Sequence, residues 1–311
     1  MKAEQMKHIF IINPVAGQGI AQKGLAEELS GRNLPFHITE RPGAGEEYVK
    51  EMCSSDSSET FRFYACGGDG TLNEVVNGAF GFTNAEIAAF PIGSGNDFVR
   101  SFDIPVERFR NIDSQVSGKA VAIDAIRYGH PGKAEDQRYA VNMFTMGLAC
   151  EVVSRAAEVK KIPLVEGSLA YMLSIFLTLI KKKGVELVIE SEDGTVYERD
   201  FILGVIGNGS FCGGGLKSAP AAVIDDGLMD MCFVDNVPRR TVVSLLPSFA
   251  KGTYLDREKI KKYITSEKCR SVTIKSVSGC WALCVDGEVI AVRDTKFEIM
   301  PDSVRFSIPL I

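Results

Sequence analysis

One stretch of the chain combines the residue types that phosphate chemistry requires. Residues 66–78 read CGGDGTLNEVVNG, in which three glycines surround a single acid, Asp69. Glycine lets the backbone approach a ligand closely, and the start of a helix favours a phosphate group through its N–H groups and its dipole. A carboxylate beside a triphosphate repels it unless a cation lies between them or the carboxylate accepts a proton. Both uses indicate phosphoryl transfer.

Two further glycine loops flank this stretch. Residues 13–19 read NPVAGQG and residues 91–98 read PIGSGNDF. A lone glycine loop is weak evidence, because turns need glycine for steric reasons. Three such loops with polar residues among their glycines are hard to explain as turns alone, and together they predict a nucleotide site. The polar residues concerned are Asn13, Asp69, Thr71, Asn73, Ser94 and Asn96.

The elements around the loops predict a parallel α/β domain. Four short apolar runs indicate strands, at residues 8–12, 35–39, 61–65 and 86–90. These runs begin about 26 residues apart, as the βαβ units of a parallel sheet do. Helices are expected at residues 21–29 and 45–52, and again after the second glycine loop. All three loops follow strands, so we expect them at the carboxyl edge of the sheet, where ligands bind in such folds.

The second part of the chain predicts a different architecture. Strands are expected at residues 121–128, 138–146, 185–191, 196–206, 229–234, 271–275, 281–285, 289–292 and 295–299. One helical stretch, residues 168–183, interrupts them, and tight turns at residues 192–194 and 286–288 join several of them. The pattern predicts a mainly antiparallel β domain of two packed sheets, with a cleft between this domain and the first one.

Length and composition narrow the class of protein. A length of 311 residues suits two domains, and 45% hydrophobic with 24% charged residues is typical of a globular protein. The formal net charge of −5 provides no general basic field, so we expect no nucleic acid partner. The eight cysteines are scattered without a CxxC pair, which favours buried, reduced thiols in a cytoplasmic protein over a zinc ribbon.

The expected relation to membranes is peripheral. The longest uncharged apolar run, residues 168–180, is shorter than the roughly 20 residues that a spanning helix needs, and the polar residues 1–7 do not form a signal peptide. Lysines flank the apolar run, which is either a core helix or a segment that lines an acyl-chain site or presents basic ends to anionic lipid. We expect a cytoplasmic protein that associates transiently with a membrane surface.

Several motifs resemble those of one known family. Residues 67–74, GGDGTLNE, are similar to the signature of the diacylglycerol kinase catalytic domain, whose family includes the soluble bacterial lipid kinases and, more remotely, the sphingosine and ceramide kinases. Residues 12–14 and 91–98 match the other two nucleotide loops of that family, in order and at fitting spacing. Residues 225–228, DDGL, and 286–288, DGE, match two later motifs, so the resemblance covers nearly the whole chain.

The resemblance implies a fold and an arrangement of domains. It implies a three-layer α/β nucleotide-binding domain with a parallel sheet at residues 1–120, on which a C-terminal tail, residues 298–311, packs back. Residues 121–297 would form a β-sandwich domain that binds the substrate, with the active site and ATP in the cleft between the two. The bacterial members of the family also suggest a homodimer.

The family's roles transfer to individual positions. The residues implied to bind ATP are Asn13, Thr39, Gly67, Gly68, Asp69, Gly70, Thr71, Leu72, Asn73, Ser94 and Asn96. Asp69 would engage the magnesium triphosphate or the attacking hydroxyl, and Glu288, with Asp286 beside it, would be the general base.

A structural magnesium site is also implied by the resemblance. The Asp226 carboxylate and the backbone carbonyls of Val223 and Leu228 would hold the ion, since Mg²⁺ needs few protein oxygens when it keeps several waters. Some members carry an acid where this chain has Val223.

Each of these motifs has a plainer alternative. The Asp286-Gly287 pair lies between strand-like residues and is also typical of a hairpin turn. The Asp225–Gly227 stretch can likewise be a turn before a strand. Asn96 and Asp97 are residue types that cap helices.

The function expected from these observations is transfer of the ATP γ-phosphate to a lipid hydroxyl. Diacylglycerol is the default acceptor and would give phosphatidic acid, although other lipid alcohols present a similar hydroxyl. The chain has no GxxxxGK[ST] motif and no protein-kinase HRD and DFG pair. Two alternatives stay open: an NAD kinase-like enzyme, and a nucleotide-binding regulator without catalysis. Replacement of Asp69 by alanine is expected to keep the fold and abolish turnover.

Overall fold

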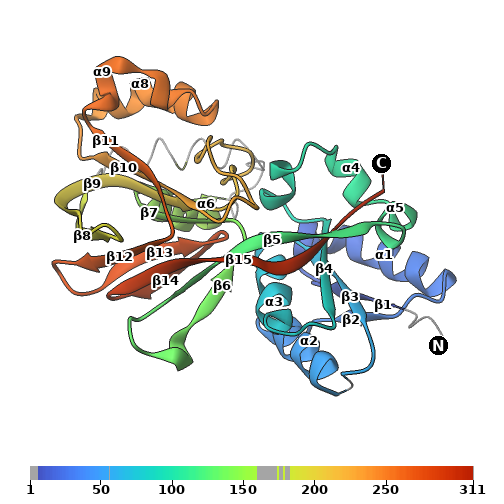
Figure 1. Cartoon of the computed structure of the whole chain (residues 1–311). Coiled ribbons are helices and arrows are strands. Elements are labelled where there is room, and N and C mark those ends of the chain that lie inside the picture. The colour runs from blue at the N-terminus through green and yellow to red at the C-terminus, as the bar shows by residue number, and fades with distance from the viewer. Residues whose placement is uncertain (1–5, 56, 160–173, 175–177, 179–182, 311) are drawn as a thin grey trace. The chain divides into compact units, whose positions relative to one another are not determined.

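The chain folds into two compact units. The computed structural model describes residues 6–55, 57–159, 174, 178 and 183–310. Unit 1 comprises Met1–Ala125 and Pro301–Ile311, and unit 2 comprises Ile126–Met300 (Figure 1). The apolar run at residues 168–180 lies almost entirely outside the described residues. Among the described residues, no helix is long and apolar enough to cross a membrane.

Unit 1 contains the predicted parallel sheet. Its strands are β1 (Lys7–Ile12), β2 (Phe36–Ile38), β3 (Phe61–Gly67) and β4 (Ala85–Pro91), in the order β2-β1-β3-β4. The last strand of the chain, β15 (Thr295–Ile308), pairs parallel to β4, with Phe306 opposite Ile87. The N-terminal α/β class that the loop spacing predicted is therefore confirmed.

Helices cover the sheet of unit 1. They are α1 (Ile20–Gly31), α2 (Ala44–Ser55), α3 (Asp69–Ala79), α4 (Val106–Phe109) and α5 (Ile112–Val116). Residues alternate between the two faces of a strand, so Phe10 and Tyr64 meet α1 and α5 in one apolar cluster. Ile11, next in sequence to Phe10, faces α2, where an added Cβ on Gly45 would lie 3.4 Å from its side chain.

A buried ion pair joins the inner strands of unit 1. Arg62 on β3 donates to Glu86 on β4 at 2.8 and 2.9 Å, and both side chains are only 7% exposed. Arg62 also donates to the carbonyls of residues 115, 116 and 118. Arg305 on β15 donates to the other oxygen of Glu86 at 2.5 Å. Glu86 therefore ties the end of the chain to the middle of the sheet.

Unit 2 is mainly antiparallel, as predicted. Its strands are β6 (Arg138–Ala140), β7 (Met143–Gly147), β8 (Val185–Ser191), β9 (Val196–Gly207), β10 (Met229–Asp235), β11 (Ile264–Cys269), β12 (Ser271–Ser276), β13 (Trp281–Val285) and β14 (Glu288–Val292). The pairing order is β14-β13-β7-β9-β8-β12-β15, and β10 pairs with both β9 and β11. One large aromatic core lies among these strands, and it includes Phe144, Phe201, Phe233, Trp281 and Phe297.

Several elements of unit 2 differ from the expectation. The run at residues 138–146 is two strands rather than one, because the carbonyl of Asn142 accepts the N–H groups of Asn208 and Gly209 at the break. Helices α6 (Leu148–Val159), α8 (Arg239–Ala250) and α9 (Glu258–Lys261) were not predicted. The strand β5 (Lys119–Gly129) and β15 are longer than expected, and each runs between the two units.

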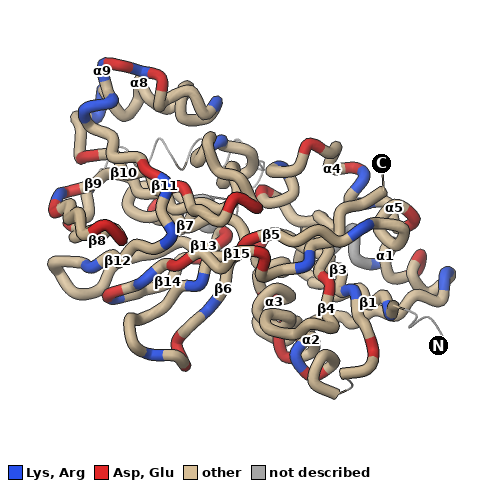
Figure 2. Tube along the Cα trace, viewed as in Figure 1, with Lys and Arg blue, Asp and Glu red and all other residues tan. Residues whose placement is uncertain are grey.

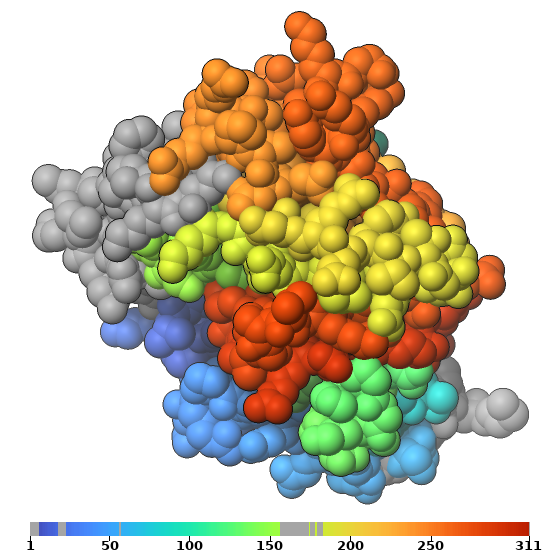
Figure 3. Space-filling model, turned by 90° about the vertical axis from the view of Figure 1, so that its left-hand side faces the viewer, coloured from blue at the N-terminus to red at the C-terminus, as the bar shows by residue number. Residues whose placement is uncertain are grey.

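The cysteines and the charges agree with the composition. All eight cysteines are free and only Cys280 is exposed, and burial raises the pKa of Cys53, Cys232 and Cys284 to about 11. Lys and Arg are interspersed with Asp and Glu over the described residues of both units (Figure 2). The orange segment with α8 and α9 packs against the yellow strands of unit 2 (Figure 3).

Candidate active site

The three glycine loops meet at the carboxyl edge of the unit 1 sheet. Strands β1, β3 and β4 are neighbours in register, with Ile12 opposite Cys66 and Gly67 opposite Pro91. The loops that follow these strands therefore begin at the same level. We refer to them as loop 1 (residues 13–19), loop 2 (residues 67–71) and loop 3 (residues 92–98). The structure brings together the polar residues that the sequence placed in these loops.

Glycine is required where the loops touch one another. A Cβ on Gly93 would lie 2.4 Å from the Cα of Gly68, and a Cβ on Gly17, whose φ is +57°, would lie 2.4 Å from the carbonyl oxygen of Ile92. No side chain fits at these distances. The N–H groups of Ile92 and Gly93 both donate to the carbonyl of Gly67 at 3.0 Å. Loop 3 is therefore fixed against both other loops by backbone contacts.

Asp69 connects loop 2 to loop 3. Its carboxylate accepts the N–H of Asp97 at 2.9 Å and the N–H of Phe98 at 3.2 Å. Burial raises the pKa of Asp69 above its ordinary value, although these N–H donors favour the ionised form. In the structure this acid holds the backbone of loop 3. A contact of Asp69 with a magnesium triphosphate or an acceptor hydroxyl stays a prediction.

Two asparagines stabilise the loops through their side chains. Asn13 donates from Nδ2 to Oγ1 of Thr71 at 3.0 Å, which joins loop 1 to loop 2. Asn96 adopts a φ of +53°, and its side chain both donates to the carbonyl of Gly93 at 2.6 Å and accepts the N–H of Gly93 at 3.1 Å. The side chain of Asn96 closes loop 3 on itself, and Asp97, the other residue considered as a helix cap, occupies the N-cap position of the short 3₁₀ helix Phe98–Ser101 without a side-chain cap bond.

The remaining predicted nucleotide residues surround the start of α3. The N-cap residue of this helix is Gly68, which has no side chain to cap the first N–H groups. Gly70 is half-buried, Leu72 is buried and donates its N–H to the Gly68 carbonyl, and Ser94 is exposed. Such a helix start is a suitable site for a phosphate group.

Two predicted residues lie deeper in unit 1. Thr39 is buried, and its N–H donates to the carbonyl of Ile12 at 2.9 Å. Asn73 is half-buried on α3 and accepts a hydrogen bond from Nδ2 of Asn77 at 3.2 Å. Neither arrangement tests nucleotide binding, which stays a prediction for both residues.

Glu74 on α3, which was not singled out from the sequence, joins α3 to the start of α2. Glu74 on α3 accepts the N–H groups of Gly43 and Gly45 at 2.9 and 3.0 Å, so its carboxylate caps the start of α2. The orientation of α3, and with it the position of its N-terminus, is thereby set by α2. Glu74 is part of the GGDGTLNE signature, and that was the available signal.

The Asp286-Gly287 pair forms the hairpin turn between β13 and β14, which was the plainer interpretation. Both residues have positive φ, +46° and +93°, and Val285 pairs with Glu288 across the turn. The Asp286 carboxylate accepts the N–H of Met143 at 3.2 Å, so the turn is attached to the start of β7. Glu288 is the first residue of β14, and its side chain is exposed.

The two carboxylates of the hairpin lie near a buried tyrosine. Burial raises the pKa of Tyr128 to about 12, the nearby Arg138 lowers it, and the charges of Asp286 and Glu288 raise it further. Tyr128 is only 7% exposed. Because Glu288 is exposed, the hairpin can be a turn and can also present a carboxylate to solvent. The turn interpretation and the general-base interpretation are therefore compatible.

Asp226, the predicted magnesium ligand, forms an ion pair with a lysine. Lys268 on β11 donates to Asp226 at 2.8 Å and to Asp230 at 2.9 Å, and the second oxygen of Asp226 accepts the N–H of Leu228 at 3.0 Å. Val223 is 45% exposed. Each oxygen of the Asp226 carboxylate has one partner, and the ammonium group of Lys268 already offsets the negative charge there. The arrangement therefore disfavours a magnesium ion while Lys268 is in place, and the ion at Asp226 stays a prediction.

The described residues contain no cluster of typical metal-ligating side chains. No group of three or more His, Cys, Asp or Glu side chains in that part of the chain is placed to hold a metal ion.

Comparisons with known proteins cover both units. Residues 7–128 match the diacylglycerol kinase catalytic domain family, and residues 145–308 match the YegS C-terminal NAD kinase beta sandwich-like domain family. The second match alone covers more than half of the chain. The chain is a member of the bacterial lipid kinase family. Its fold class and the family named from the sequence motifs are thereby confirmed.

Individual relatives of this lipid kinase family member align over most of its length. The "Probable lipid kinase YegS-like" of Serratia proteamaculans (strain 568) is 28% identical over 97% of this chain and 93% of its own. The diacylglycerol kinase of Staphylococcus carnosus (strain TM300) is 28% identical over 90% and 87%. A crystal structure of a diacylglycerol kinase from Bacillus anthracis str. Sterne has a TM-score of 0.66 and 20% identity over 98% and 97%, which shows a shared fold.

Proposed function

We propose that this protein transfers the γ-phosphoryl group of ATP to the hydroxyl of a lipid, with diacylglycerol as the acceptor and phosphatidic acid as the product. The observation that carries the proposal is the set of three closely packed glycine loops around the start of α3, whose N-cap residue is a glycine. Closely packed glycines leave backbone N–H groups and a helix dipole as the available partners, and these suit phosphate oxygens.

The nucleotide would be bound by groups that are already in place. Phosphoryl transfer depends mainly on positioning and on electrostatic stabilisation, so preorganised backbone donors serve it well. Asp69, Asn13 and Asn96 would contribute by holding the three loops in register. Mg²⁺ would enter with the triphosphate and offset its negative charge near Asp69.

Glu288 is the better candidate for the general base. Its carboxylate is exposed at the start of β14, whereas the Asp286 carboxylate accepts the N–H of Met143 and shapes the turn. A base must reach the proton of the acceptor hydroxyl, and an exposed carboxylate can do so. Asp286 would then act as a positioning residue that fixes where Glu288 lies.

The relatives support a lipid acceptor over NAD. The relatives compared above carry the names of lipid or diacylglycerol kinases, and the N-terminal match is to the diacylglycerol kinase catalytic domain. We further propose that the protein meets its acceptor at a membrane surface, since diacylglycerol resides in membranes.

The test is ADP release with magnesium and ATP against diacylglycerol, sphingosine, undecaprenol and NAD, with lipids presented in mixed micelles. We expect turnover with diacylglycerol, and a decrease of about 10²- to 10⁴-fold in the Glu288→Gln variant, the usual contribution of a general base. Turnover with NAD alone would assign the protein to the alternative kinase activity. Tight ATP binding without turnover on any acceptor would favour a nucleotide-binding regulator.

A further inference from the structure

The end of loop 3 is attached to the core of unit 1 by one aromatic residue. Between Ile92 and Phe98 the loop reads GSGND, which contains no apolar side chain. Phe98 is fully buried, and its N–H donates to the Asp69 carboxylate at 3.2 Å. Because the glycines and short polar residues of the loop have no apolar groups to bury, the position of its last residues depends on how the ring of Phe98 is packed.

The last strand of the chain packs against this ring. Phe306 on β15 is fully buried, and its ring lies edge-on to that of Phe98, with 5.2 Å between the centroids and an angle of 86°. The ring of Phe306 is also stacked on Phe102, at 5.2 Å and 11°. Phe102 in turn meets Phe98 edge-on at 5.5 Å. Three mutually contacting rings therefore join β15 to the end of loop 3.

The strand that presents Phe306 is itself held firmly in unit 1. Phe306 lies opposite Ile87 in the pairing of β15 with β4. Its neighbour Arg305 donates to Glu86 at 2.5 Å, and the N–H of Leu310 donates to the carbonyl of residue 114 at 2.8 Å. Phe306 is therefore a fixed support for the ring of Phe98, although it lies more than 200 residues further along the chain.

We propose that Phe306 is a positioning residue of the nucleotide site, which acts on the bound phosphate groups through Phe98 and Asp69. The ring of Phe306 holds Phe98, the Phe98 N–H bonds to Asp69, and this acid joins loop 3 to loop 2 beside the start of α3. A shift of about 1 Å in such a frame can lower a rate about 100-fold. The identity of the nucleotide as ATP rests on the proposed function, whereas the support of loop 3 by β15 does not.

The first test is hydrogen exchange of the full-length protein without any ligand. Phe306→Leu keeps an apolar side chain and removes the ring. We expect the N–H groups of Asp97 and Phe98 to exchange about tenfold faster than in the wild type, which corresponds to about 1.4 kcal/mol, the order of one aromatic pair. The N–H groups of β3 serve as the internal reference, because they report on unfolding of the whole unit.

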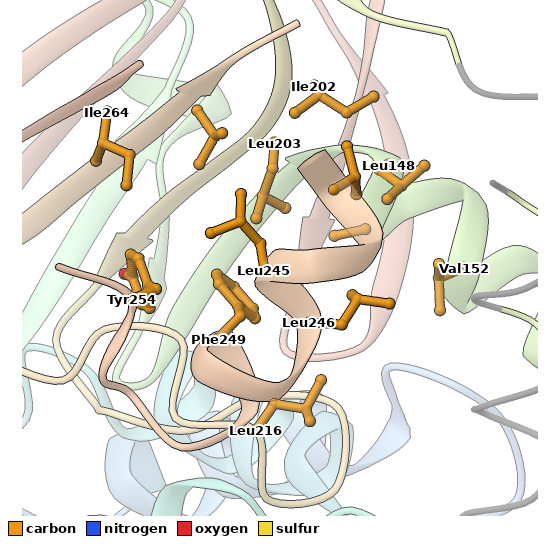
Figure 4. A pocket seen from close by; sticks show the side chains of 13 residues that line it. Leu148, Val152, Ile202, Leu203, Leu216, Leu245, Leu246, Phe249, Tyr254 and Ile264 are labelled. Carbon is orange, nitrogen blue, oxygen red and sulfur yellow. The ribbon is translucent and has the colours of Figure 1, made fainter. Parts of the chain in front are cut away.

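Two matched variants remove a phenylalanine ring elsewhere. Phe297→Leu makes the same change on the same strand, at a fully buried residue of unit 2 whose ring lies 4.9 Å from that of Phe144. Phe249→Leu makes it on α8, where Figure 4 shows Phe249 among apolar side chains of unit 2 and its ring lies 5.0 Å from that of Tyr254. We expect both controls to leave the exchange of the two loop 3 N–H groups unchanged relative to that of β3.

Titration calorimetry with magnesium ATP then measures the effect on the nucleotide site. We expect about tenfold weaker binding in Phe306→Leu, the same factor as for the exchange, and unchanged binding in Phe297→Leu and Phe249→Leu. If diacylglycerol is phosphorylated, KM for ATP should rise about tenfold in Phe306→Leu while KM for diacylglycerol stays unchanged. A loss of folded protein alone would lower the apparent kcat and leave both KM values unchanged.

The outcomes separate this inference from the proposed function. Faster loop 3 exchange and weaker ATP binding in Phe306→Leu, without phosphorylation of any acceptor by the wild type, would overturn the proposed function and leave the role of Phe306 supported. Unchanged loop 3 exchange in Phe306→Leu, or an equal loss of ATP affinity in Phe306→Leu and Phe297→Leu, would overturn the role of Phe306 even if turnover is observed. Absence of ATP binding by the wild type would overturn both.

Discussion

The glycine loops of unit 1 and the hairpin of unit 2 differ in how their polar side chains are bonded. In the loops, the side chains of Asn13, Asp69 and Asn96 bond to other parts of the loops. In the hairpin, Asp286 bonds to the backbone of β7, while Glu288, two residues later, is exposed. Under the proposed function, the loops bind a flexible triphosphate, which needs a rigid frame, and Glu288 accepts a proton, which needs access to the acceptor. We therefore expect substitutions in unit 1 to affect stability and the substitution of Glu288 to affect rate.

The largest effect on stability is expected at the buried ion pair of unit 1. Arg62→Met leaves the Glu86 carboxylate largely buried beside the exposed Arg305 alone, and removal of one partner from a buried pair costs about 3–5 kcal/mol. Urea unfolding measures the loss. Arg305→Met is the matched control, since its side chain is 60% exposed and such pairs contribute about 0–1 kcal/mol. Equal losses of unfolding free energy in Arg62→Met and Arg305→Met would contradict the expected difference between the buried and the exposed arginine.

The next effect is expected at Asp69. Asp69→Ala removes the acceptor of the Asp97 and Phe98 N–H groups, and a buried donor left without a partner costs about 1–3 kcal/mol. The sequence expectation that the alanine variant keeps its fold and loses turnover is compatible with this loss but did not include it. Asp69→Asn keeps one carbonyl acceptor of the same shape and should lose less stability. Hydrogen exchange of these two N–H groups checks the cause, and unchanged protection in the alanine variant would refute it.

A smaller effect is expected at the Asp226–Lys268–Asp230 group of unit 2. Lys268→Met leaves two carboxylates near each other, and because the lysine side chain is 33% exposed the cost should be about 1–2 kcal/mol. Millimolar MgCl₂ should restore part of the lost Tm in this variant and leave the wild type unchanged. An equal magnesium effect on the wild-type Tm would mean that the ion displaces Lys268, which would restore the expected structural site.

The smallest effect on stability is expected at Glu288. Glu288→Gln changes an exposed side chain without a hydrogen bond or ion pair among the described residues, so the free energy of unfolding should change by less than about 0.5 kcal/mol. We expect the Glu288→Gln substitution to lower kcat and to leave stability unchanged. Asp286→Asn, at the turn beside it, should instead lower both stability and rate. A stability loss for Glu288→Gln larger than that for Asp286→Asn would reverse the roles of the two residues.

Local patterns in the sequence predicted the parts of the molecule that depend on local chemistry. The strand-loop-helix pattern around Gly67 and Asp69 located the candidate nucleotide site, and the Asp286-Gly287 pair located the hairpin, because positive φ at adjacent residues favours these types. The expectation missed α8, which contains Pro247, a residue that usually indicates a helix end.

Long-range partners could not be predicted from a single sequence. The donors to Asp69 lie 28 and 29 residues further along the chain, and Lys268 lies 42 residues after Asp226. No periodicity reports which residues of different loops or strands will meet. The expectation of a magnesium ion at Asp226 came from the family resemblance, and nothing in the sequence indicated the ion pair with Lys268, because β11 was itself not predicted.

The strand β15 has a consequence for biosynthesis. Residues 301–310 belong to unit 1, and Arg305 bonds to Glu86, which precedes it by 219 residues. A chain emerging from the ribosome exposes its N-terminal domain first, and an ordinary N-terminal domain folds before the next one is made. Here the sheet of unit 1 receives its last strand only after all of unit 2 has been translated. Early release of the nascent chain would therefore yield a unit 1 whose sheet lacks β15 and whose Glu86 lacks the bond from Arg305.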